Sequence, residues 1–139
     1  MPKPLAAVLL AAAIAVLALA GCATAPLGAS SAERVTPSAF RAPAANTAQL
    51  VVTRDTGFTS SACATHVYVN GELAVDLRPG QTATMHVPVG EVIVGAQPAS
   101  ICAGGLVEAS GAIKRGDTLR YRIGYDQNGG IGLFRTAVR

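Results

Sequence analysis

The chain has 139 residues, a formal net charge of +3, no tryptophan and three cysteines, and half of its residues are hydrophobic. This length accommodates one domain and a flanking segment. The arginines are scattered and few aromatic residues accompany them, so no nucleic-acid partner is expected.

An export signal is predicted over residues 1–21. Lys3 supplies positive charge, and the run 5–20 that follows is uncharged and apolar. As a helix this run would be about 24 Å long, short of the roughly 20 residues that cross a bilayer comfortably. The pattern therefore favours a secretory signal peptide over a permanent membrane span.

The signal ends in Leu19-Ala20-Gly21-Cys22, which resembles the lipobox of bacterial lipoproteins. The resemblance implies that signal peptidase II cuts before Cys22 and that this residue carries diacylglycerol and a further acyl chain such as palmitate. Several acyl chains anchor a protein stably. No aspartate follows the cysteine, which implies a lipid anchor in the outer membrane, facing the periplasm. The alternative is that Cys22 is a buried core cysteine.

Residues 22–47 are predicted to be the lipidated cysteine and a flexible linker, because alanine, serine, threonine and proline dominate without a sustained period. Val35 and Phe40 are the apolar residues in this segment that would dock locally. A domain is expected over 48–139.

Short β-branched runs separated by turn residues about every 8 to 12 positions make this domain all-β, and a small antiparallel β-sandwich is expected. In the hairpin 65–77, Asn70-Gly71 supplies a type I′ turn, and Leu73 should share the core face with Val75. The eight expected strands are 49–54, 65–69, 72–77, 81–88, 91–97, 105–113, 117–126 and 130–138.

The strand 117–126 alternates apolar residues with Arg120 and Arg122, which predicts a half-buried strand with a cationic outer face. Arg120 and Arg122, with Arg135, form a candidate surface for an acidic envelope protein or a polysaccharide. The alternative is that these arginines only keep an exposed sheet soluble.

If Cys22 carries lipid, Cys63 and Cys102 remain as an even pair in an oxidising compartment, and we expect a disulfide near one end of the sandwich. A metal or redox pair is the alternative, but the chain has no CxxC spacing. His66 and His86 are expected to face solvent, although a metal site that includes both is geometrically conceivable. No metal or other cofactor is expected.

The stretch 67–96 is similar to PEGA-type repeats and related carboxypeptidase-regulatory-like β-sandwich modules of bacterial surface lipoproteins. The similarity rests mostly on turn residues, in the runs VYVNG, LRPG and VPVGE. With RDTGF at 54–58 and the two later cysteines, the chain looks like a group of proteobacterial outer-membrane lipoproteins of uncharacterised activity. That resemblance supplies no catalytic residue to carry over.

The sequence contains no GxSxG motif, and its few carboxylates are dispersed, so no enzyme activity is expected. The expected function is that of a non-catalytic envelope lipoprotein, a membrane-tethered accessory or binding module. The alternative is a periplasmic inhibitor or immunity lipoprotein that inserts the loop 98–104 into a lysozyme-like hydrolase or a toxin.

Overall fold

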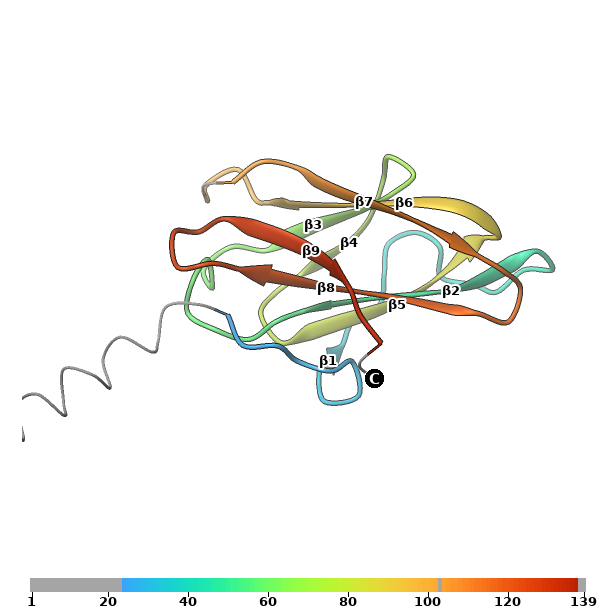
Figure 1. Ribbon diagram of the computed structural model, residues 1–139, viewed down its shortest axis with the longest axis horizontal. Helices are drawn as coiled ribbons and strands as arrows, with labels where there is room; N and C mark the ends of the chain where they lie inside the picture. Colours follow the sequence, from blue (N-terminus) through green and yellow to red (C-terminus); the bar gives the residue numbers. More distant parts are fainter. Residues whose placement is uncertain (1–23, 103, 138–139) are drawn as a thin grey trace, which may run out of the picture.

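The computed structural model describes residues 24–102 and 104–137 as a β-sandwich without a helix (Figure 1). Consequently, none of these residues belongs to a helix that could span a membrane. The predicted signal peptide and Cys22 lie outside the described residues. The strands are β1 (Glu33–Arg34), β2 (Thr47–Arg54), β3 (Thr65–Val69), β4 (Glu72–Leu77), β5 (Gln81–Pro88), β6 (Gly90–Pro98), β7 (Val107–Ile113), β8 (Thr118–Tyr125) and β9 (Ile131–Arg135).

Two sheets face each other, one with the order β1-β5-β2-β8-β9 and the other with the order β4-β3-β6-β7. This confirms the predicted all-β sandwich. Two strand pairs depart from a purely antiparallel arrangement, because β2 runs parallel to β8 and β1 runs parallel to β5. The chain between β2 and β8 forms the whole of the opposite sheet, so it is long enough to bring β8 back beside β2 in the same direction.

The core lies between the sheets and consists mainly of aliphatic side chains, as the composition predicts. In β8 the alternating residues Leu119, Tyr121, Ile123 and Tyr125 are all buried, which confirms the predicted core face of that strand. The other large buried apolar residues include Leu50, Val52, Val67, Val69, Leu77, Met85, Val87, Val92 and Val94.

A β-bulge in β4 changes the face on which Leu73 lies. Val75 is opposite Val67, but Leu73 is opposite Tyr68, so Ala74 is an extra residue in the pairing. Ala74 is fully buried, whereas Leu73 is 45% exposed. The prediction that Leu73 faces the core is therefore wrong, because strict alternation fails where a bulge inserts one residue.

The segment expected to be a flexible linker is held against the domain over its described part, 24–47, and its last residue, Thr47, begins β2. The Thr24 N–H donates to the carbonyl of Tyr125 at 3.1 Å, and the His86 N–H donates to the carbonyl of Phe40 at 2.8 Å. Val35 and Phe40 also pack on the core, as the sequence suggested for these two residues. Composition does not reveal this docking, since backbone pairing with a sheet edge needs no periodic side-chain pattern.

The predicted disulfide is present between Cys63, which precedes β3, and Cys102, in the loop after β6. The Cα atoms are 6.3 Å apart, within the usual range for a disulfide. The bond lies at the end of the sandwich where Thr65 of β3 pairs with Pro98 of β6. It therefore ties together two loops that adjacent strands already bring close.

Replacing both cysteines, Cys63→Ala with Cys102→Ala, is expected to lower the free energy of unfolding by about 4 kcal/mol, because a bond with a sequence separation of 39 no longer restricts the unfolded chain. Urea unfolding measures the change. The single variant Cys102→Ala should lose nearly as much, since it breaks the same bond. A double variant as stable as the wild type would contradict this account.

Candidate functional site

The loops 55–64, 78–80, 99–106 and 126–130 gather at one end of the sandwich, which we call the disulfide end (Figure 1). Residue 103 of this set lies outside the described residues. The strand register explains the grouping, because Thr65 pairs with both Leu77 and Pro98, and Arg54 pairs with Ile123. The buried charged residues of the described chain, Arg54 and Asp55, lie here.

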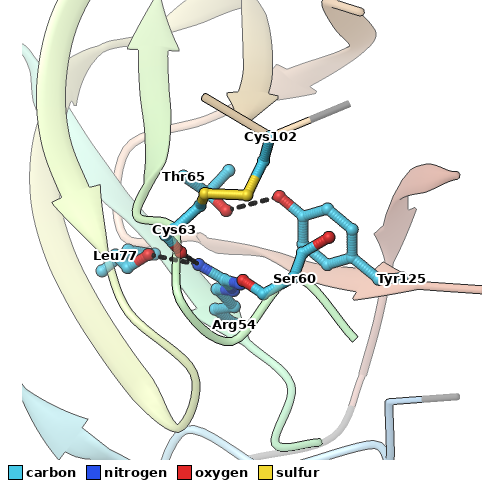
Figure 2. Close-up of a disulfide and its surroundings, with 7 residues drawn as sticks. All are labelled: Arg54, Ser60, Cys63, Thr65, Leu77, Cys102 and Tyr125. Carbon is cyan, nitrogen blue, oxygen red and sulfur yellow. Dashed lines mark hydrogen bonds between the residues drawn. A yellow bond between two sulfur atoms is a disulfide. The ribbon is translucent and has the colours of Figure 1, made fainter. Parts of the chain in front are cut away.

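Arg54, the last residue of β2, is fully buried. Its Nη1 donates to the carbonyl oxygens of Cys63 at 2.5 Å and Leu77 at 2.9 Å, and its Nη2 donates to that of Ser60 at 2.7 Å. The guanidinium carbon lies 4.9 Å from the centre of the Tyr125 ring (Figure 2). One side chain thus connects the loop 55–64 to β4 and β8.

The Arg54 guanidinium is neutralised by no carboxylate among the described residues, and its Nε has no hydrogen-bond partner there. Burial lowers its pKa, against the opposing effect of Tyr125. Carbonyl dipoles and the face of an aromatic ring therefore replace the water that the charge has lost.

Sequence reasoning missed this buried charge. The signal was present, because Arg54 continues the inward alternation of Leu50 and Val52 in β2. An arginine at the end of an apolar face is ordinarily expected to reach out to solvent. Here the carbonyl groups of the following loop fold over the guanidinium instead.

Asp55, the next residue, is also buried but pairs with a different set of groups. Its Oδ2 accepts a hydrogen bond from Nη1 of Arg122 at 3.0 Å, and its Oδ1 accepts one from the Leu27 N–H at 3.2 Å. Burial raises the pKa of the Asp55 carboxyl above its ordinary value of 3.8, against the lowering effects of Arg122 and Leu27.

A pocket of about 320 Å³ surrounds this ion pair. Thr24 and Pro26 from the N-terminal segment form one side of it, and Gly124 and Phe134 from β8 and β9 form another. The ring centre of Phe134 lies 5.6 Å from the guanidinium carbon of Arg122. The N-terminal segment is thus part of the wall of the pocket.

The three arginines of the predicted cationic surface lie on the neighbouring strands β8 and β9. Arg120 and Arg122 alternate with the buried residues of β8 and so share its outer face. Arg135 is opposite Tyr121 in the pairing of β8 with β9, and it lines a groove together with Arg120. Arg122 is also engaged by Asp55, while Arg120 lines a separate shallow groove with Arg34 of β1.

The two histidines belong to different sheets, His66 to β3 and His86 to β5. His66 instead lies beside Asp76, with Nδ1 2.6 Å from Oδ1. Within the described ranges, no group of three or more histidine, cysteine, aspartate or glutamate residues is arranged to hold a metal ion. The structure therefore does not bring His66 and His86 together in a shared site.

The variant Arg54→Met is expected to lose about 3 to 5 kcal/mol of unfolding free energy, because three carbonyl groups would stay buried without their donor. Arg54→Lys should lose less, since it keeps the charge but not the planar fork. Urea unfolding measures both variants. The exposed Arg78→Met is the matched control and should stay within about 0.5 kcal/mol of the wild type. An equally small effect of Arg54→Met would show that the carbonyl contacts contribute nothing.

Asp55 should contribute more to the free energy of unfolding at low pH than at neutral pH. Because its pKa is raised in the folded state, the folded protein holds this proton more tightly than the unfolded chain, whose carboxyl titrates near the ordinary value of 3.8. Its contribution to stability is therefore complete below that value and is lost as the pH rises through the folded-state pKa.

The wild type should accordingly gain stability relative to Asp55→Asn as the pH falls through this window, which urea unfolding at a series of pH values measures. The asparagine variant supplies the baseline, because it removes this titration and leaves the other carboxyls in place. If the wild type instead loses stability relative to the variant as the pH falls, attraction to Arg122 lowers the pKa of Asp55 more than burial raises it.

Comparisons with known proteins leave the chain without an assigned family: no protein-family model, no curated protein and no solved structure matches it. The similarity to PEGA-type modules remains a prediction from the turn residues. A function for this chain must therefore be argued from its own residues.

Proposed function

We propose that this chain is a bacterial envelope lipoprotein, anchored to the outer membrane through acyl chains on Cys22 and facing the periplasm. Its sandwich serves as a non-catalytic accessory or binding module. The run Leu19-Ala20-Gly21-Cys22 supports the anchor. The main structural support for the proposal is the position of Thr24.

Thr24 is already part of the hydrogen-bonded domain. Its N–H donates to the Tyr125 carbonyl at 3.1 Å, and its Oγ1 accepts a hydrogen bond from the Tyr125 N–H at 2.8 Å. Removal of residues 1–21 would leave every one of these contacts intact. The hydrogen-bonded domain thus already includes the second residue after the cysteine at which the lipobox resemblance places the mature N-terminus.

The two buried charged groups whose pKa values are shifted, Arg54 and Asp55, both bind other parts of the fold. Arg54 holds carbonyl groups of a loop and a strand end, and Asp55 holds Arg122 and the backbone of the N-terminal segment. Structural ion-pair and hydrogen-bond networks shift pKa values just as active sites do. These contacts support a module that acts through its surface.

A second candidate function is inhibition of a hydrolase or toxin by the loop 98–104. Ile101 is 85% exposed on this loop, and the loop is held by the disulfide at Cys102 and by a 2.9 Å hydrogen bond from the Ala99 N–H to the Ala64 carbonyl. A firmly held loop with an apolar tip suits insertion into a cleft. This function requires the loop to be accessible when the protein is on its membrane.

The variant Cys22→Ala is expected to lose its acyl chains and to leave the membrane fraction, because the thiol is the predicted attachment point. Mass spectrometry of the mature N-terminal peptide and membrane fractionation measure the two effects. In wild-type cells, globomycin should cause the uncut precursor to accumulate.

Thr24→Ala is the matched control for this experiment, since it leaves the lipobox unchanged and should stay in the membrane fraction. Finding Cys22 unmodified in wild-type protein taken from cells would contradict the anchor.

A further inference from the structure

Large apolar side chains project from the two loops that the disulfide joins. Phe58 in the loop after β2 is 81% exposed, and Ile101 in the loop after β6 is 85% exposed. Leu106, just before β7, is 50% exposed. The stretches 56–62 and 99–106, TGFTSSA and ASICAGGL, contain no charged residue. Such a surface is costly to leave in water and suits an apolar partner.

The N-terminal segment reaches the domain at this same end. Thr24 is hydrogen-bonded to Tyr125, the last residue of β8. Ala25 forms an antiparallel bridge with Thr56, which lies two residues before Phe58. Two residues span at most about 7 Å even when fully extended. A lipid attached two residues before Thr24 would therefore join the chain within about 7 Å of Thr24.

We propose that the disulfide end of the sandwich rests on the bilayer and inserts Phe58 and Ile101 into its interfacial region. This inference rests on the proposed lipid anchor at Cys22. A flexible linker of 25 residues would hold the domain about 25 to 30 Å from its anchor. Because the chain is instead docked from Thr24 onward, the membrane lies directly beneath the uncharged loops.

The two loops are firmly held in position for this contact. Arg54 binds the carbonyl groups of Ser60 and Cys63, and the disulfide joins that loop to the one carrying Ile101 (Figure 2). The Cys102 N–H also donates to the Ala99 carbonyl at 2.9 Å. Loops that are ordered before binding lose little conformational entropy when they insert. The buried Arg54 guanidinium thus helps to order the loop that exposes Phe58.

The disulfide end has exposed charged residues only outside the two apolar loops, Arg78 in the loop 78–80 and Asp126 in the loop 126–130. The opposite end has no comparable apolar tip among the described residues of its β7–β8 turn. The turn between β7 and β8 carries Lys114, Arg115 and Asp117, all exposed. Between this turn and the disulfide end, β8 extends about 23 Å. A residue in the turn would therefore stay in water while the disulfide end contacts lipid, which makes Lys114 a matched control position.

The absence of tryptophan from the chain permits a direct test with single fluorescent reporters. The variants Phe58→Trp, Ile101→Trp and Lys114→Trp are purified from membranes as the mature protein and reconstituted in phosphatidylcholine vesicles with and without bromine on the acyl chains. Flotation of the vesicles reports the anchor independently. Both loop reporters should emit at shorter wavelength and lose more than about half of their intensity to brominated lipid, as expected for side chains about 5 to 10 Å into the interface. Lys114→Trp should keep its intensity.

The possible failures are distinguishable. Protein that does not float with the vesicles would overturn the lipid anchor and this inference with it. Protein that floats, but whose loop reporters are quenched no more than Lys114→Trp, would overturn the inference and leave the anchor standing. A blue-shifted loop reporter that brominated lipid does not quench would overturn the inference and show that a second copy of this chain covers the loops in place of lipid. Two separate loop reporters keep the test informative if one substitution disturbs folding.

Discussion

The disulfide end is organised around one buried guanidinium. Arg54 offers its donors to the carbonyl groups of Ser60, Cys63 and Leu77 and places its charge near the face of the Tyr125 ring. Each carbonyl group is a poorer partner than a carboxylate, but together they satisfy a planar fork from several directions. The loop 55–64 contains no named strand or helix. The hydrogen bonds from Arg54 and the disulfide therefore hold it in place.

The adjacent residues Arg54 and Asp55 carry opposite charges and bind different parts of the fold. Because side chains alternate along an extended chain, Arg54 enters the core while Asp55 points to the other side, where Arg122 and the Leu27 N–H bind it. The first residue orders the loops with the apolar tips, and the second helps to hold the N-terminal segment beside them. Loop order and the position of the N-terminal segment thus both depend on one dipeptide at the end of β2.

The sandwich has two unlike ends, and this asymmetry gives the proposed lipoprotein an orientation. The stretches around Phe58 and Ile101 are uncharged, whereas the turn at Lys114 and Arg115 is ionic. A domain on a long tether would sample many orientations and present any face to a partner. A domain docked from Thr24 onward is restricted, so under the proposed anchor the turn at Lys114 and Arg115 would lie farthest from the bilayer.

Local patterns in the sequence determined much of the fold. Alternation in β8 assigned Leu119 and Ile123 to the core, turn residues located the hairpin at Asn70-Gly71, and an even number of remaining cysteines indicated the disulfide between Cys63 and Cys102. These predictions succeed because side-chain alternation and turn geometry depend on neighbours in the chain.

The candidate site was much less accessible from the sequence. The burial of Arg54, the docking of Thr24 on Tyr125, the bulge at Ala74 and the parallel pairing of β2 with β8 were decided by the tertiary structure alone. Each depends on groups far away in the sequence or on the register between strands, which a one-dimensional pattern does not encode.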